Sequence, residues 1–206
     1  MLYDLDDSEK NLTSIKVIFV GEPGVGKTNL INISVGNCFD DQSQTTLRAS
    51  FQSKKIKVDN KEYNLNLWDT IGDQKFKDFS KIFYKGAHIV IIMYDITNKK
   101  TFEQLTYWVN NINEALGDDI LKAIVGNKID LLENAQVTEE EGKKFAESVG
   151  AEFKLASAKT NEQNFELFLE KLLKEFLRND KFVVRDSIRL RKSRKSKSGK
   201  RKCCQK

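Results

Sequence analysis

Residues 15–28 read IKVIFVGEPGVGKT, an apolar run followed by a glycine-rich loop that ends in Lys27 and Thr28. The apolar run predicts a buried strand, and the residues after Thr28 have the apolar spacing of a helix. Glycines at such a junction let backbone N–H groups converge on phosphate oxygens, and the helix N-terminus adds partial positive charge. The segment therefore predicts a phosphate-binding loop; the alternative is a plain glycine turn that leads into a helix.

The residues that end this loop carry the chemistry of a nucleoside triphosphate site. The Lys27 ammonium can reach the terminal phosphates, and the Thr28 hydroxyl can bind Mg²⁺. A second cluster, Trp68-Asp69-Thr70-Ile71-Gly72, ends a predicted strand roughly forty residues later. Asp69 can complete the magnesium shell and the Gly72 amide can contact the third phosphate, although Asp-x-x-Gly alone also fits a plain turn.

Short apolar strands alternate with helical patterns along the chain, which is typical of βαβ units around a largely parallel sheet. Residues 47–58 and 61–69 are expected to form a hairpin around Asp59-Asn60, because apolar residues alternate in the second strand. This hairpin would make one edge of the sheet antiparallel.

The remaining apolar patterns indicate further strands and helices. Residues 88–94 and 120–125 are continuous apolar runs, as expected of strands buried on both faces, and another strand is expected over 152–155. Apolar residues recur every three or four positions from Phe102 to Leu116 and from Phe165 to Phe176, which predicts two amphipathic helices. In total we expect an α/β fold with a six-stranded, mostly parallel sheet, one antiparallel edge strand and five helices.

Charge is distributed unevenly along the 206 residues, whose net charge is +5. Residues 181–206 hold 12 Lys or Arg against one Asp, which gives that segment +11 and leaves −6 for the rest. We expect a short N-terminal extension over 1–13, one globular domain over 14–180 and a disordered basic tail over 181–206. The acidic start and the absence of a ~20-residue apolar run favour a cytosolic protein without a secretory signal or membrane span.

Two further polar segments follow predicted strands. Asn127-Lys128-Ile129-Asp130 comes directly after Gly126, and Ser157-Ala158-Lys159 comes after the strand that begins at Glu152. In open α/β sheets ligands gather beyond the carboxyl ends of the strands, so we expect both segments on the rim that holds the phosphate loop. Taken alone, Asn-Lys-Ile-Asp also fits a solvated turn.

In order and spacing, these motifs resemble those of Ras-superfamily small GTPases, specifically the Rab family, over nearly all of residues 15–177. Within that family, TTLRASF at 45–51 and VGNKIDL at 125–131 resemble the endosomal branch, the Rab-five and Rab-twenty-one type. The resemblance implies a P-loop NTPase fold of small-GTPase type over 14–180. It also implies binding of GTP or GDP with Mg²⁺, hydrolysis of GTP, and a switch function in vesicle traffic.

Guanine specificity has a physical basis in Asp130. Its carboxylate only accepts hydrogen bonds, and guanine offers it two donors, N1–H and the 2-amino group. Adenine lacks both, and a site built around such bonds can discriminate by about 10⁴–10⁵. The resemblance implies further that Asn127 ties the base loop together, that Phe39 and the Lys128 stem cover the base, and that the Ala158 amide meets the exocyclic oxygen. The residues expected to bind GTP are Gly21, Glu22, Pro23, Gly24, Val25, Gly26, Lys27, Thr28, Asn29, Phe39, Thr46, Gly72, Asn127, Lys128, Asp130, Ser157, Ala158 and Lys159.

Thr46 lies in a polar stretch that packing alone cannot hold. The resemblance implies that Thr46 joins Thr28 and Asp69 as a magnesium ligand and contacts the third phosphate through its amide. Loss of that phosphate would then release the segment, and the loop after Gly72 would act as a second switch.

Three aromatic residues, Phe51, Trp68 and Phe83, match the hydrophobic triad that effector proteins bind in the Rab family. Phe83 replaces the usual tyrosine and lacks its hydroxyl. The alternative is that these side chains simply fill the core.

One departure from the family pattern concerns hydrolysis. Asp73 stands where the family's water-positioning glutamine follows Asp-x-x-Gly, and a short anionic side chain suits that role poorly beside a phosphate. We expect hydrolysis to be slower by about two or three decades, unless Gln74 substitutes or an activating protein supplies an arginine and a glutamine. The expected catalytic residues are Asp73, Gln74, Lys27 and Thr46. Pro23, where other Rabs often carry Ser or Gly, removes one backbone donor from the phosphate loop.

Cys203-Cys204 near the end of the chain resembles the paired cysteines that Rab proteins have geranylgeranylated. Two lipid chains anchor a protein firmly, and the basic run over 189–202 is attracted to anionic lipid. Without the cysteines this run would be a solvated tail or a nucleic-acid patch. The resemblance implies a monomer on the cytosolic face of endosomal membranes, with effectors, an exchange factor, an activating protein and prenyl-delivery and extraction chaperones as partners, and no nucleic acid.

Two alternative functions stay open at this point: a GTP-dependent scaffold in which Asp73 has removed hydrolysis, and an RNA-associated GTPase that uses the basic tail. His88, the single histidine, is expected to be structural. Cys38, which follows the first helix, is expected to be a small buried thiol. Since no Cys/His group has zinc spacing, the nucleotide's Mg²⁺ is the metal we expect.

Overall fold

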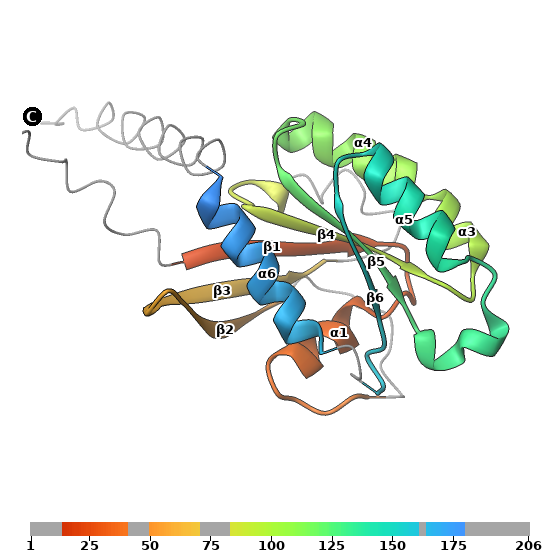
Figure 1. The fold of residues 1–206 in the computed structure, drawn as a ribbon, viewed down its shortest axis with the longest axis horizontal. Helices are drawn as coiled ribbons and strands as arrows, with labels where there is room; N and C mark the ends of the chain where they lie inside the picture. Colours follow the sequence, from red (N-terminus) through yellow and green to blue (C-terminus); the bar gives the residue numbers. More distant parts are fainter. Residues whose placement is uncertain (1–13, 41–49, 71–82, 161–163, 180–206) are drawn as a thin grey trace, which may run out of the picture.

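The computed structural model describes residues 14–40, 50–70, 83–160 and 164–179, which form one α/β domain around a central sheet (Figure 1). The sheet has six strands in the order β2-β3-β1-β4-β5-β6. Its strands are β1 (Ser14–Gly21), β2 (Ser50–Val58), β3 (Lys61–Asp69), β4 (Ile89–Asp95), β5 (Leu121–Asn127) and β6 (Glu152–Ala156). All neighbouring pairs are parallel except β2 and β3, which run antiparallel at one edge, as predicted.

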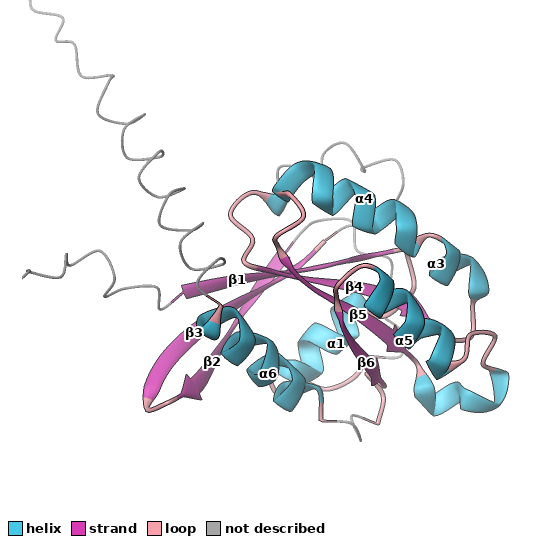
Figure 2. Cartoon of the chain, turned by 45° about the horizontal axis from the view of Figure 1, so that its top comes forward, coloured by secondary structure: helices cyan, strands magenta, loops and turns pink. Residues whose placement is uncertain are grey.

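Five α-helices lie within the described ranges and match the number predicted. They are α1 (Lys27–Ser34), α3 (Lys99–Glu103), α4 (Leu105–Leu116), α5 (Glu139–Ser148) and α6 (Phe165–Arg178), and a 3₁₀ helix, η3, covers Ile129–Asn134. The helices cover both faces of the sheet (Figure 2). None of these helices has the length and apolar character needed to cross a bilayer.

Successive residues of the central strands point to opposite faces, and each face has its own core. Val17 and Phe19 of β1 belong to the cluster under α1 and α6, whereas Ile18 and Val20 belong to the cluster under α4 and α5. This alternation explains why β1, β4 and β5 are continuous apolar runs in the sequence: both of their faces are buried.

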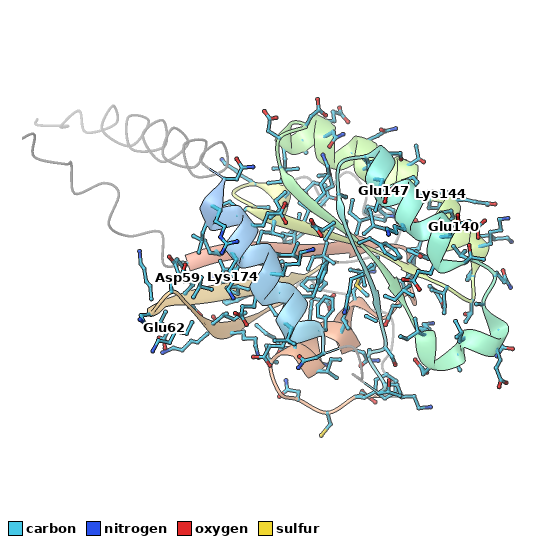
Figure 3. All side chains as sticks on the ribbon, in the orientation of Figure 1. Asp59, Glu62, Glu140, Lys144, Glu147 and Lys174 are labelled. Atoms are coloured by element: carbon cyan, nitrogen blue, oxygen red, sulfur yellow. The ribbon has the colours of Figure 1, made fainter. Side chains whose placement is uncertain are left out.

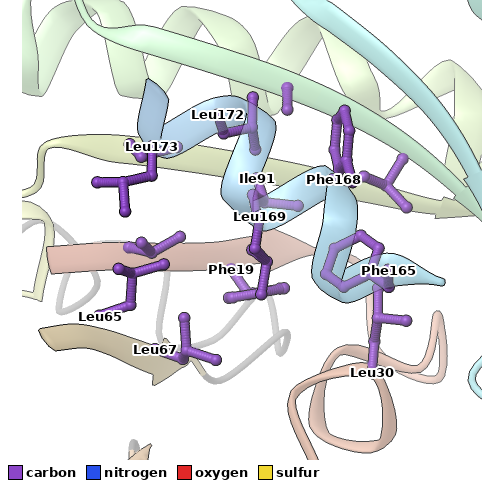
Figure 4. Close-up of a cluster of buried hydrophobic side chains, with 14 of the residues drawn as sticks. Phe19, Leu30, Leu65, Leu67, Ile91, Phe165, Phe168, Leu169, Leu172 and Leu173 are labelled. Atoms are coloured by element: carbon purple, nitrogen blue, oxygen red, sulfur yellow. The ribbon is translucent and has the colours of Figure 1, made fainter. Parts of the chain in front are cut away.

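Helix α6 supplies most of the aromatic surface of the first cluster (Figure 4). Its buried side chains recur at three- and four-residue intervals, as predicted, and its N-terminus is capped by the Asn164 side chain, which accepts from the Leu167 amide. Phe165 lies 6.3 Å from Phe19 of β1 between ring centroids. The α6 side chains that face the sheet are Phe165, Phe168, Leu169, Leu172, Leu173 and Phe176.

Charged side chains such as Glu62, Glu140 and Lys144 lie at the surface, away from these cores (Figure 3). Glu140 and Lys144 form an ion pair one turn apart on α5. Helix α5 begins with a capping box in which Thr138 and Glu141 hydrogen-bond reciprocally. The hydrogen bonds of the capping box fix where α5 begins. Because these bonds and the ion pair are exposed, they contribute little to the stability of the domain.

The structure corrects two local predictions, one about the bounds of a helix and one about the burial of a cysteine. The helix expected from Phe102 to Leu116 begins earlier, at Lys99, and is divided at Gln104 into α3 and α4. The Thr101 side chain ties α3 to the end of β4, because its hydroxyl donates to the Asn98 carbonyl and accepts from the Asp95 amide. These bonds hold α3 beside the end of β4.

The second error concerns Cys38, which is exposed rather than buried. Helix α1 ends at Ser34, and the chain that follows lies at the surface without regular structure. Phe39, the residue after Cys38, packs against the core in its place. His88, expected to be structural, accepts a hydrogen bond from the Lys16 amide at 2.8 Å and packs edge-on against Phe176.

Candidate nucleotide-binding site

The phosphate loop joins β1 to α1 and passes unusually close to two other segments. A Cβ atom at Gly21 would lie 2.3 Å from the carbonyl oxygen of Met93 in β4, and one at Gly26 would lie 2.3 Å from Nδ2 of Asn127. Both glycines also have positive φ, +140° and +92°. Only glycine fits at these two positions, because any side chain would collide with the backbone of β4 or with the base loop.

Lys27 begins α1 and is buried under the loop. Its Nζ donates to the carbonyl oxygens of Gly21 and Glu22, each at 2.9 Å. Burial lowers the pKa of Lys27 to about 8, while the carboxylates of Asp69 and Glu22 act in the opposite direction. A phosphate at this position would add negative charge and more acceptors, and would therefore favour the charged form of Lys27.

Thr28 and Asp69 meet at the rim although they come from different elements. The Thr28 hydroxyl, in the first turn of α1, donates to Oδ2 of Asp69 at the end of β3 at 2.7 Å. Hydroxyl and carboxylate oxygens are ligands that Mg²⁺ prefers, and Mg²⁺ usually takes few protein ligands together with phosphate oxygens. The pair fits such an ion. Within the described ranges, no cluster of three His, Cys, Asp or Glu side chains has the arrangement of a metal site.

Asn127 links three segments of the rim through its buried side chain. Its Nδ2 donates to the Val25 carbonyl in the phosphate loop at 2.8 Å, and its Oδ1 accepts from the Ala158 amide at 3.2 Å. The loops after β1, β5 and β6 are therefore joined through a single amide. These are the segments that the sequence predicted to lie on one rim.

Asp130 and Ser157 face each other across the base loop. The Ser157 hydroxyl donates to Oδ1 of Asp130 at 2.6 Å and accepts from the amides of Lys159 and Thr160, each at 3.1 Å. Asp130 itself is exposed. Strong discrimination between guanine and adenine requires the Asp130 carboxylate to be buried. The bound base would therefore supply that burial, while Ser157 holds the carboxylate in place.

Two contacts at the rim were not foreseen from the sequence. Lys128 has a positive φ of 71°, and its Nζ pairs with Oδ2 of Asp95 at 2.6 Å. The other oxygen of Asp95 accepts from the amide and the hydroxyl of Thr97, so this carboxylate joins the β4 end to the base loop. The available signal was the position of Asp95 directly after a buried strand, on the same rim.

The second unforeseen contact connects α4 to the phosphate loop. The indole N–H of Trp108, a residue buried in α4, donates to Oε1 of Glu22 at 3.1 Å. The two residues are 86 positions apart, so no local pattern could have revealed the contact. It gives the Glu22 carboxylate a defined position beside Lys27.

Comparisons with known proteins agree with this geometry. The family described as "Ras family" matches residues 16–178. Ras-related protein Rab-21 of Homo sapiens is 42% identical over 157 residues, which cover 76% of this chain and 70% of the relative. Ras-related protein Rab-18 of Caenorhabditis elegans is 38% identical over 172 residues, which cover 82% and 84%.

The chain belongs to the Rab group of the Ras family. Membership confirms the small-GTPase fold predicted for this Rab protein, and the Ras family consists of GTPases that generally use Mg²⁺ with GTP or GDP. A third relative, Ras-related protein Rab-21 of Geodia cydonium, is 39% identical over 155 residues, which cover 75% of this chain and 68% of the relative.

The three aromatic residues matched to the Rab triad come together on the surface of this Rab protein. The rings of Phe51 and Trp68 stack with 5.2 Å between centroids, and Phe83 lies 6.5 Å from Trp68. The Lys16 ammonium lies 4.3 Å from the Trp68 ring centroid. Phe51 is 57% exposed, so it does not fill the core, which was the alternative explanation for this residue.

Several expected site residues of this Rab protein lie outside the described residues. These are the expected switch and catalytic positions Thr46, Gly72, Asp73 and Gln74, and the expected lipidation sites Cys203 and Cys204. Among the expected nucleotide contacts that are described, Phe39 is half-buried against the first core cluster next to α1.

Proposed function

We propose that this Rab protein is a switch that binds GTP or GDP with Mg²⁺ and recruits effectors in vesicle traffic, on endosomal membranes. The observation that supports this most directly is the Asn127 amide, which joins the phosphate loop to both loops of the expected base site. One rim of the sheet thereby carries a lysine for phosphates, oxygen ligands for Mg²⁺ and a carboxylate for guanine.

Each residue of the rim would have a defined task. Lys27 would exchange its two carbonyl acceptors for oxygens of the terminal phosphates. Thr28, Asp69 and Thr46, the last outside the described residues, would hold Mg²⁺, which neutralises phosphate charge when bound. Asp130, held by Ser157, would accept from N1–H and the 2-amino group of guanine.

The first test concerns base selectivity and uses Asp130→Asn. The substituted amide can donate to a 2-oxo group but offers only one acceptor to guanine, so the variant should lose affinity for GDP by about 10³-fold or more and prefer xanthosine diphosphate. Affinities would be measured by competition against a fluorescent nucleotide. Glu133→Gln, which removes another exposed carboxylate close by, should leave the guanine preference intact. A wild-type protein that binds ATP as well as GTP would contradict the proposal.

The second test concerns the chemical step. We propose that Asp73 makes hydrolysis slow, because an anionic side chain disfavours both the attacking water and the developing charge. Asp73→Gln should speed single-turnover hydrolysis of bound GTP by about two or three decades. Equal rates would show that Asp73 does not impair the reaction.

A second candidate function, a GTP-dependent scaffold without hydrolysis, is favoured by the same residue. It predicts that bound GTP stays intact even when a Rab activating protein is added. If the activating protein restores turnover in the natural chain, the switch is favoured over the scaffold, since such proteins can supply the missing groups in trans.

A further inference from the structure

A buried asparagine in the first turn of α1 holds the backbone of the loop that follows this helix. Nδ2 of Asn29 donates to the Asp40 carbonyl at 2.9 Å, and the Asp40 amide donates to Oδ1 of Asn29 at 3.3 Å. One side chain thus satisfies both backbone groups of Asp40, much as a neighbouring strand would. Asn29 is only 7% exposed, which shields its end of these bonds from water, while Asp40 at the other end is exposed.

The loop held in this way is also tied at Asn37, whose amide donates to the Asn32 carbonyl and whose side chain donates to Gln52. After α1 the chain runs along the surface without regular structure (Figure 1), and Asn37, Cys38 and Asp40 are exposed. Phe39 is half-buried and packs against the first core cluster. Its position therefore depends strongly on the backbone of its neighbour Asp40, and that backbone is held by Asn29.

A second amide contact of α1 offers a comparison. One turn further along, Oδ1 of Asn32 accepts from the Gln52 side chain, which in turn accepts from Asn37. This contact ties α1 to the beginning of β2 and reaches the same loop at Asn37, two residues before Phe39, but it does not involve Asp40. Asn32 is thus a residue of the same type, on the same helix, with a different target.

We propose that the Asn29 side chain is a positioning residue that holds Phe39 against the bound nucleotide and thereby sets how long the nucleotide stays. This inference rests on the proposed function, in which Phe39 covers the guanine. Release of the base requires Phe39 to move away, and Phe39 moves freely only after both Asn29 bonds to Asp40 have opened. A pair of hydrogen bonds can open without disrupting the core, so it suits a gate better than packing would.

The experiment uses the full chain loaded with a fluorescent GDP, which is then displaced by excess unlabelled GDP. Asn29→Ala should release the nucleotide about tenfold faster than wild type, since two hydrogen bonds are lost. A non-hydrolysable GTP analogue should be released faster by the same factor, because Phe39 faces the part that both nucleotides share. Asn32→Ala, the matched control, should change release by less than about twofold.

A double-mutant cycle distinguishes positioning from a general loss of structure. In a Phe39→Ala background, Asn29→Ala should add almost nothing, because the residue through which it acts is gone. Equal acceleration in both backgrounds would overturn the inference. If Asn29→Ala does not fold, Asn29→Ser serves instead, since its hydroxyl is too short to reach both backbone groups of Asp40.

Failure of the inference is distinguishable from failure of the proposed function. A wild-type protein that retains no GDP would overturn both. A wild type that retains GDP and releases it at the same rate as Asn29→Ala would overturn only the role of Asn29.

Discussion

Lys27 is a buried lysine, and burial disfavours its charged form until a phosphate binds. Its pKa of about 8 lies below the ordinary 10.5, because burial disfavours the ammonium more than Asp69 and Glu22 favour it. The folded protein therefore loses the Lys27 proton at a lower pH than the unfolded chain. Between pH 8 and 10.5 the unfolded chain holds more protons, so stability rises with pH in that window.

This shift predicts a pH dependence for the nucleotide-free protein. From pH 8 to 10.5, the contribution of Lys27 to the free energy of unfolding should rise by about 3 kcal/mol. Urea unfolding at pH 8 and at pH 10.5 would measure it, and Lys27→Met should lack this increment. Saturating GDP with Mg²⁺ should also flatten it, because phosphate charge raises the pKa of Lys27. An equal pH slope in Lys27→Met would contradict the assignment.

The turn of the β2–β3 hairpin determines which aromatic side chains lie beside each other at the surface. Its turn residues Asp59 and Asn60 both have positive φ, 48° and 62°, as a tight two-residue hairpin turn requires. That turn sets the register, and the register makes Phe51 and Trp68 direct cross-strand partners. The exposed stack of the two rings follows from a turn at the other end of the hairpin.

We expect Phe51→Ala to weaken effector binding without destabilising the fold. Phe51 is 57% exposed, so little apolar area is lost from the core, while an aromatic anchor at an interface commonly contributes tenfold or more to affinity. Proteins captured from lysate on the GTP-loaded chain, quantified by mass spectrometry, would report the loss. Leu132→Ala removes another exposed apolar side chain, 65% accessible in η3, and should retain the same partners. Unchanged capture by Phe51→Ala would argue against this surface.

The rim depends on contacts between elements far apart in the chain. Trp108 connects α4 to the phosphate loop, and Asp95 connects β4 to the base loop. Trp108 lies in a helix that covers the sheet, and Asp95 lies at the carboxyl end of β4. The fold therefore positions the loops through polar contacts, as well as through packing of the strands.

At the level of the whole molecule, residues 1–180 have a net charge of −6 and residues 181–206 have a net charge of +11. We expect membrane association to require lipid on both Cys203 and Cys204, since charge alone is screened within about 8 Å at physiological salt. An N-terminally tagged chain with both cysteines changed to serine should be diffuse in the cytosol by microscopy. Cys38→Ser, which removes the third, exposed cysteine, should leave the distribution unchanged. Persistent membrane association of the double variant would refute lipid anchoring.

The sequence by itself determined the phosphate loop, the antiparallel hairpin and the strands buried on both faces. Each depends on signals within a few neighbouring residues: glycines before Lys27, the Asp59-Asn60 turn, and continuous apolar runs. The order of the rim segments could also be predicted, because parallel strands bring their carboxyl ends to one edge of the sheet.

Only the tertiary structure decided which polar side chains meet at that edge. The contacts of Asn29 with Asp40, Glu22 with Trp108 and Lys128 with Asp95 each join segments that local pattern cannot relate. The division of the helix at Gln104 and the exposure of Cys38 were likewise visible only in the structure. In each of the three contacts the outcome depends on a partner outside the local sequence pattern, and folding alone brings the two groups within hydrogen-bonding or ion-pairing distance.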